Sequence, residues 1–272
     1  GDANVAALMG RAFSLKPDRR RVVYAAENDR RAAEQLSECV RRQAGLAGRG
    51  ARFLNTTIGK MSQLTEAGRE IEGYRLEPVA PGLDRAFLVE EGNHIRVSQC
   101  ELLDSTTGFQ NFSEKDDLTP FLEAKLYGHN CIHCILAFMG ARRGLERMPE
   151  LRDAEQLMSI GRKAFIDEVG EALLRKYADL DDKLFTPEGF VNYAEDLLGR
   201  MTNPYLDDAV DRVLRDPMRK LAPRGRVFGA MRLALDHEFE PEHLAHGAAA
   251  GIDHVLTHAE ELEVPDRLLF DS

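Results

Sequence analysis

The sequence predicts a partial α/β domain over residues 1–105, followed by an all-α domain over residues 106–272. Two observations lead to this division. The first sixty residues have the order strand, helix, strand, which is the unit of an α/β domain. Beyond residue 119 the apolar residues recur only at helical spacing. A chain of 272 residues is also long enough to bury two ordinary cores.

The first part contains the elements of a parallel sheet. A helical apolar rhythm covers residues 4–13, and residues 22–26 are a short apolar run typical of a buried parallel strand. Good cap residues at 27–29 open an amphipathic helix through about residue 42. A Gly-rich stretch at 45–50 then leads to a second strand at 51–57. Short, partly polar strands are expected at 74–80, 86–89 and 94–97.

The second part is predicted to be helical. Residues 105–113 have the composition of a loop. Thr119 and Pro120 form a good helix opening, with Pro at the first helical position, and this helix should continue to about Arg142 and end before Gly144. Further helical patterns cover residues 153–178, 187–201, 205–214, 224–237 and 241–262.

Composition excludes several classes of function. The net charge of −10 disfavours a nucleic-acid partner, because phosphate binding requires a basic surface. No apolar run approaches the ~18 residues of a membrane span, and the N-terminal residues lack a signal-peptide core. Four cysteines in a chain of this length do not form a disulfide framework. We therefore expect a cytoplasmic protein with reduced thiols and no nucleic-acid or membrane partner.

The candidate chemistry lies in the middle of the helix that begins at Thr119. Lys125, Asn130 and His133 stand at i, i+5 and i+8, which corresponds to roughly 0°, 140° and 80° around an α-helix. The long Lys stem can close the gap, so one face can offer an amine, an amide and an imidazole. Gly128 costs ~1 kcal/mol relative to Ala in a helix, and we expect it to let a substrate approach the backbone.

These residue types suit the oxidation of an alcohol. A lysine acts as a general base only if its pKa falls from ~10.4 towards 7–8. That change favours the neutral amine by ~4 kcal/mol, and burial is its usual cause. Amide and imidazole groups can hold the oxygen as it gains alkoxide character. On the residues alone, a mixed helix face with a snorkelling Lys125 and an Asn130–His133 pair remains an alternative.

A metal site is the competing interpretation of the same stretch. Cys131, Cys134, His129 and His133 carry thiol and imidazole groups, which zinc prefers. However, Cys-x-x-Cys on a continuous helix is poorly placed for shared chelation, and no second Cys-x-x-Cys follows. The later histidine pairs, at 243/246 and 254/258, lack the glutamate of a His-Glu-x-x-His motif. We therefore expect no metal, and interpret both cysteines as small core residues.

Three motifs resemble those of the polyol-specific long-chain dehydrogenases. Residues 121–140 resemble the Lys-x4-Asn-x2-His signature of that family. Residues 198–221 are similar to a block of its mannitol-1-phosphate 5-dehydrogenase branch, Arg-Phe-x-Asn-Pro-Tyr-Leu followed by Arg-x-Pro-x-Arg-Lys-Leu. Residues 25–31 resemble the Cys-Glu-Asn motif that closes the nucleotide-binding domain. The likeness covers almost the whole chain.

The resemblance implies a fold and a reaction. The fold is a partial Rossmann-like dinucleotide-binding domain followed by a multi-helical domain like the C-terminal domain of 6-phosphogluconate dehydrogenase. The reaction is a metal-independent hydride transfer between NAD and a polyol or polyol phosphate, of the mannitol 1-phosphate/fructose 6-phosphate type. The only partner implied is this small molecule, and the oligomeric state is a monomer or a dimer.

The resemblance also implies residue roles. Lys125 is the general acid/base, and Asn130 and His133 orient the reacting oxygen. Asn28 approaches the substrate and, with Glu27, the cofactor. The substrate-binding residues are Arg215, Arg219, Lys220 and Arg200, where guanidinium groups suit phosphate. Alternatively, the basic cluster at 215–220 is a solvated helix end that complements the helix dipole.

The sequence departs from the family in two places. It contains no Gly-x-Gly-x-x-Gly turn between a strand and a helix, which in the family cradles the dinucleotide pyrophosphate. The NAD site is therefore expected to be incomplete, and the shortened chain inactive or weakly active. Gly59 stands where the family has an Asp. Two alternatives remain: a non-catalytic module that binds a sugar phosphate or another partner, and a helical protein that binds metal through His and Cys.

Overall fold

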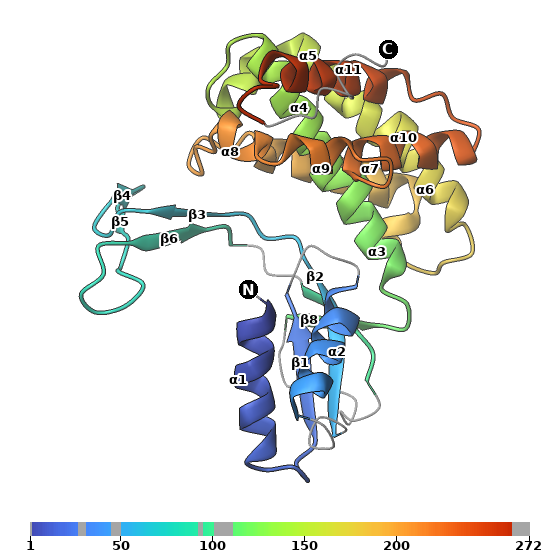
Figure 1. The fold of residues 1–272 in the computed structure, drawn as a ribbon. Helices are drawn as coiled ribbons and strands as arrows, with labels where there is room; N and C mark the ends of the chain where they lie inside the picture. Colours follow the sequence, from blue (N-terminus) through green and yellow to red (C-terminus); the bar gives the residue numbers. More distant parts are fainter. Residues whose placement is uncertain (1, 27–30, 45–49, 92–94, 101–110, 263–272) are drawn as a thin grey trace. The chain divides into compact units, whose positions relative to one another are not determined.

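The computed structural model describes residues 2–26, 31–44, 50–91, 95–100 and 111–262. Contacts group the chain into two compact units (Figure 1). The first comprises residues 1–60 and 90–122, and the second comprises residues 61–89 and 123–272. The predicted division between residues 105 and 106 stays a prediction about domain organisation.

The first unit is built on a four-stranded mixed sheet in the order β1-β2-β7-β8. Strands β1 and β2 are parallel with Arg21 opposite Ala51, whereas β7 runs antiparallel to β2 and parallel to β8. Its elements are α1 (Asp2–Ser14), β1 (Arg21–Ala25), α2 (Ala32–Ala44), β2 (Ala51–Ile58), β7 (Ile95–Ser98) and β8 (Phe112–Lys115). The predicted strand–helix–strand unit is confirmed.

Helices α1 and α2 pack against each other and share a small core with the sheet. Phe13, Val40 and Ala51 are buried in it. Asn55 on β2 accepts a hydrogen bond from the backbone N–H of Ala33 at 3.0 Å, which satisfies one of the free amides in the first turn of α2. The strand therefore fixes the start of the helix that the cap pattern predicted.

Two predictions about strands were wrong. Residues 112 and 113 lie in β8 rather than in a loop, and residues 101–110 of the predicted loop fall outside the described residues. The strand predicted at 74–80 ends at Arg75, with Pro78 shortly after it; proline cannot donate to a strand ladder.

The second unit includes two small antiparallel ladders. β3 (Ser62–Thr65) pairs with β6 (Ala86–Val89), and β4 (Glu70–Ile71) pairs with β5 (Tyr74–Arg75). The sequence did not predict β3, because a four-residue run with Leu64 as its one large apolar residue gives little alternation.

The rest of the second unit is helical, as predicted. Helix α4 is the centre of this unit. Nine of its residues between Cys131 and Gly140 are buried, and the helix packs against α5, α8, α10 and α11. A helix that is apolar on all sides belongs inside a core. Helix α3 (Thr119–Glu123) belongs to the first unit except for its last residue. The helical elements of the second unit are η2 (Ala124–Asn130), α4 (Cys131–Arg142), η3 (Met148–Asp153), α5 (Glu155–Lys163), η4 (Ala164–Gly170), α6 (Glu171–Lys176), η5 (Lys183–Phe185), α7 (Pro187–Met201), α8 (Val210–Leu214), α9 (Pro217–Leu221), α10 (Arg226–Asp236) and α11 (Glu242–Thr257).

Two of the predicted long helices contain a π-helical turn. In the helix predicted from Thr119 to Arg142, residues 124–130 form the π segment η2. In the helix predicted over 153–178, residues 164–170 form the π segment η4. Both are marked by a backbone bond to the fifth preceding residue: Cys131 N–H to Leu126 O in the first, and Glu171 N–H to Ile166 O in the second.

The helix predicted over 205–214 begins only at Val210. Val210 N–H donates to Glu146 O at 2.9 Å, and Met148 N–H donates to Asp208 O at 2.8 Å. Residues before the helix are thus bonded in an extended arrangement to the segment around Arg147, with which Ala209 forms a β-bridge. These bonds take the place of helical ones.

Gly128 brings the two π segments into direct contact. A Cβ atom on Gly128 would lie 2.6 Å from the Cε2 atom of Phe165 in η4. The aromatic ring therefore occupies the space beside the Gly128 backbone. The prediction that a substrate approaches the backbone there was wrong.

Replacing Gly128 with Ala is expected to destabilise the protein by about 1–3 kcal/mol, because overpacking a close contact outweighs the helix propensity of Ala. The matched control is Gly199→Ala in α7, where an added Cβ meets no atom within 4 Å. The free energy of unfolding of that variant should instead increase by up to about 1 kcal/mol, because Ala has the higher helix propensity. Urea unfolding of both variants measures the difference, and shifts of the same sign would contradict it.

Candidate active site

The π segment η2 changes how Lys125 and Asn130 are placed. In an α-helix, residues five apart point in widely different directions, whereas π-helical hydrogen bonds join residues five apart. Lys125 and Asn130 are separated by five positions and lie within η2. The π turn therefore brings their side chains nearer to one face than the α-helical projection of about 140° predicts. π-Bulges occur frequently at functional sites.

Lys125 lies in an environment that favours its neutral amine. Its side chain is half-buried, and burial lowers the pKa of Lys125 below the usual value, with the positive charge of Arg226 as the second cause. A lower pKa is what a lysine general base requires near neutral pH. The role of Lys125 as the general acid/base stays a prediction.

His133 and its neighbour His129 are both held neutral. The side chain of His133 is 13% exposed, and burial lowers its pKa to about 4 although the nearby Asp208 carboxylate acts in the opposite direction. His129 is buried, and burial lowers its pKa well below the usual value; repulsion from His133 when both rings carry a proton is the second cause. The two ring centroids are 6.2 Å apart. Neither imidazole is protonated at pH 7.

These neutral histidines make the protein sensitive to acid. The pKa of His133 falls from 6.5 to about 4 on folding, so the folded state binds fewer protons than the unfolded state between these values. The free energy of unfolding is therefore highest above about pH 6.5. It decreases by about 3 kcal/mol through His133 as the pH falls towards 4. Urea unfolding at pH 7 and pH 4.5 measures the loss. His133→Gln should reduce it, and an unchanged pH dependence in that variant would disprove the assignment.

Asp208 links His133 to Arg212. The Oδ2 atom of Asp208 lies 3.5 Å from Nε2 of His133, without hydrogen-bond geometry. Both carboxylate oxygens of Asp208 accept hydrogen bonds from the guanidinium group of Arg212. The Asp208 side chain is only 8% exposed, so the carboxylate is buried between a cation and an imidazole.

The predicted substrate-binding residues differ in their surroundings. Lys220 is 5% exposed, and burial lowers its pKa to about 8. Arg219 and Arg215 are exposed, with Arg219 3.7 Å from Asp216. Arg200 bonds to Asp196 at 3.0 Å, and its charge also lowers the pKa of His129. Lys220 and Arg200 thus lie near the histidines.

Arg226 is a residue that the sequence did not single out. Its side chain is half-buried in the first turn of α10. Its positive charge lowers the pKa of Lys125, His129, His133 and Lys220. Two glycines allow this position. A Cβ on Gly225 would lie 2.7 Å from Lys220 O, and one on Gly229 would lie 2.8 Å from the Tyr127 ring. Gly225 and Gly229 are the only sign in the sequence that α10 packs closely against α9 and η2 and so places Arg226 near the candidate site.

The cysteines next to the candidate site belong to the core. Cys131 and Cys134 are fully buried free thiols, as predicted, and burial raises the pKa of both. Among the described residues, no group of three His, Cys, Asp or Glu side chains could hold a metal ion. Within the same residues, no helix has the length and apolar character needed to cross a membrane. Glu27 and Asn28 lie outside the described residues.

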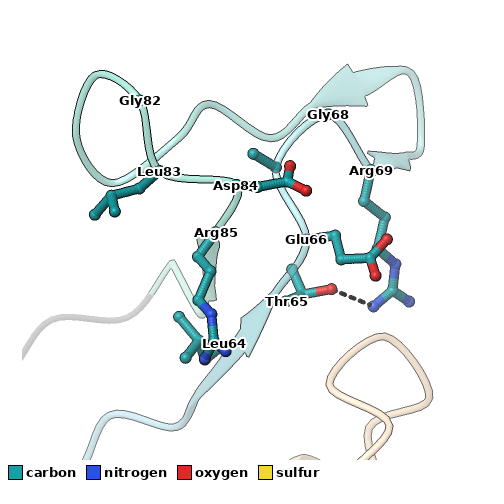
Figure 2. A pocket seen from close by; sticks show the side chains of 10 residues that line it. Leu64, Thr65, Glu66, Gly68, Arg69, Gly82, Leu83, Asp84 and Arg85 are labelled. Carbon is teal, nitrogen blue, oxygen red and sulfur yellow. Dashed lines mark hydrogen bonds between the residues drawn. The ribbon is translucent and has the colours of Figure 1, made fainter.

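A pocket lies away from these residues. Figure 2 shows it between the loop that follows β3 and the loop that precedes β6. It has a volume of about 940 Å³ and is lined by residues 64–69 and 82–85. Arg69 donates a hydrogen bond to the Thr65 hydroxyl at 3.3 Å. None of the predicted site residues lines this pocket.

The comparisons of the sequence with known proteins all point to one family. The family model for the mannitol dehydrogenase C-terminal domain matches residues 117–271, more than half of the chain. Mannitol-1-phosphate 5-dehydrogenase from Bacillus subtilis (strain 168) is 34% identical over 137 residues, covering 50% of this chain and 34% of that protein. The enzyme of the same name from Arthrobacter sp. (strain FB24) is 30% identical over 249 residues, covering 90% of this chain and 59% of that protein.

Solved structures agree at the level of the fold. A D-sorbitol dehydrogenase in substrate-free form aligns over 92% of this chain and 51% of its own, with a TM-score of 0.66 and 13% identity. Pseudomonas fluorescens mannitol 2-dehydrogenase, in a ternary complex with NAD and D-mannitol, aligns over 85% of this chain and 46% of its own, with a TM-score of 0.56 and 16% identity. The chain spans about a third of the length of the Bacillus subtilis relative, 34%. Residues 117–271 are a mannitol dehydrogenase C-terminal domain, and the chain belongs to the mannitol dehydrogenase family.

Proposed function

We propose that this chain carries the substrate-binding and proton-transferring part of an oxidoreductase that moves a hydride between NAD and a polyol or polyol phosphate. Lys125 is the general acid/base in this proposal. The observation that carries it is the half-buried amine of Lys125 on a π-helical turn, with its pKa lowered by burial and by Arg226. Family membership supports the reaction class.

The chemistry divides between the cofactor and the chain. NAD would supply the acceptor for the hydride of the alcohol carbon. Neutral Lys125 takes the hydroxyl proton as the C–H electron pair departs and the carbonyl forms. The amide of Asn130 donates a hydrogen bond to the oxygen while it has alkoxide character. Lys220 and Arg226 add positive charge nearby, which also suits the phosphate of a polyol phosphate.

The residues of this chain do not form a complete cradle for NAD. The 272 residues contain no Gly-x-Gly-x-x-Gly turn between a strand and a helix, and such a turn is what holds the pyrophosphate in dinucleotide-binding domains. Asn28 and Glu27 remain proposed contacts of the cofactor. A second candidate function is a module that binds a polyol phosphate without oxidising it, and the exposed Arg215 and Arg219 beside the buried Lys220 favour the phosphate.

Two measurements on the chain separate these functions. Isothermal titration calorimetry with D-mannitol and with mannitol 1-phosphate measures binding, and NADH absorbance in the presence of NAD measures turnover. Binding together with turnover supports the oxidoreductase. Binding of the phosphate without turnover supports the module, and the absence of both binding and turnover overturns the two proposals together.

A further inference from the structure

Asp208 is held rigidly beside His133. Its backbone oxygen accepts the N–H of Met148 at 2.8 Å, and Val210, two residues later, donates to Glu146 O at 2.9 Å. Its carboxylate receives two hydrogen bonds from the guanidinium group of Arg212 in α8. The carboxylate therefore has little freedom to turn away from His133.

The arrangement leaves one oxygen of Asp208 directed at an unsatisfied nitrogen. Nε2 of His133 is buried and has no hydrogen-bond partner, although Oδ2 of Asp208 lies 3.5 Å away. An ionised carboxylate has about four lone-pair sites, of which Arg212 uses two. A ring shift of about 0.3 Å brings the pair to ~3.2 Å, within hydrogen-bond range. Catalytic hydrogen bonds are often long before substrate binds.

A carboxylate in this place decides which imidazole nitrogen carries the proton. A neutral imidazole has one N–H donor and one acceptor, and the partner of one nitrogen determines the role of the other. Asp208 can only accept when it is ionised, so it selects the form of His133 with hydrogen on Nε2. The lone pair then resides on Nδ1.

We propose that Asp208 is a positioning residue that fixes His133 in its Nε2–H form, so that Nδ1 accepts a hydrogen bond from a substrate hydroxyl. The part that concerns the substrate rests on the proposed function. It assigns different tasks to the two side chains that the sequence grouped together. Asn130 donates to the reacting oxygen, whereas His133 accepts from a hydroxyl of the polyol and holds the substrate in one orientation.

Charged groups of both signs act on His133, so removing one or another of them should shift the pKa of His133 in opposite directions. Asp208 raises the pKa of His133, while Arg212 on α8, Lys220 on α9 and Arg226 on α10 lower it. His129, in the preceding π segment, has its ring centroid 6.2 Å from that of His133. Asp208→Asn should therefore lower the pKa of His133 further, and Arg212→Met should raise it towards the usual value.

Long-range ¹H–¹⁵N NMR of the chain labelled on its histidine rings tests the proposal. His133→Gln assigns the signals. At neutral pH the unmodified chain should show His133 with hydrogen on Nε2, and Asp208→Asn should lose this preference. The control Asp211→Asn, at an exposed residue of α8, removes the same charge and should leave the tautomer unchanged.

Three results would overturn the proposal: an Nδ1–H tautomer in the unmodified chain, an unchanged tautomer in Asp208→Asn, or equal pKa shifts in Asp208→Asn and Arg212→Met. If Asp208→Asn does not fold, the tautomer of the unmodified chain and the shift in Arg212→Met still decide. The NMR readout needs no substrate. A chain with the expected tautomer that neither binds nor oxidises a polyol would refute the proposed function and leave the positioning role standing.

Discussion

Lys125→Met is expected to lower kcat/KM for polyol oxidation by about 10²–10⁴-fold, the usual contribution of a positioned general base. Methionine keeps most of the length and apolar volume of the lysine stem but has no amine. It also removes a positive charge beside Arg226, so the fold should be retained or slightly stabilised. The measurement is the initial rate of NADH formation with the preferred polyol at saturating NAD.

Two controls make the result specific. Lys163→Met removes an exposed lysine from α5 and should leave the rate unchanged. Lys125→Arg keeps the charge but cannot lose its proton near pH 7, so its rate should fall about as far as that of Lys125→Met. A Lys125→Arg enzyme with the normal rate would show that the charge matters and the proton transfer does not.

The second large effect is structural and concerns Glu168. Glu168 lies in the π segment η4 with its side chain only 5% exposed. Its carboxylate accepts the backbone N–H groups of His243 at 2.6 Å and Leu244 at 2.9 Å, and Nδ1 of His243 lies 2.8 Å from Oε1. These amides belong to the first turn of α11, whose positive end favours a negative charge.

Glu168→Leu is expected to lower the free energy of unfolding by about 3–5 kcal/mol, because it leaves two helix amides and an imidazole without their partner. For a domain of this size, each kcal/mol lowers Tm by about 2–4 °C. Differential scanning calorimetry measures the change. Glu168→Gln retains an acceptor oxygen, so its Tm should fall less. Glu171→Gln changes an exposed residue in the next turn and should leave Tm nearly unchanged. Equal losses for Glu168→Leu and Glu171→Gln would contradict the capping role.

The sequence was informative where local chemistry determines structure. The strand–helix–strand unit follows from apolar runs and cap residues within about forty positions, and the helical second part follows from spacing and from Pro120. Lys125, Asn130 and His133 could be selected because their residue types suit one reaction. None of these inferences needed contacts between distant residues.

The features that were missed depend on such contacts. The π segment η2 lies against Phe165, thirty-seven positions after Gly128, and a pattern search at 3.6 residues per turn cannot detect it. Arg226 is an ordinary basic residue until Gly225 and Gly229 allow α10 to pack against α9 and η2. Asp208 is one of two adjacent aspartates, and only the bonds to Arg212 and Met148 direct it towards His133. Tertiary packing creates these roles.

The proposed proton transfer requires that folding lowers the pKa of Lys125 below that of an ordinary lysine. NMR titration of the chain with ¹³C-dimethylated lysines measures this directly, with Lys125→Arg to identify the signal. The signal of Lys125 should titrate at a pKa clearly below the usual 10.5. A Lys125 signal that titrates at or above the usual 10.5 would show that burial does not make this amine a general base.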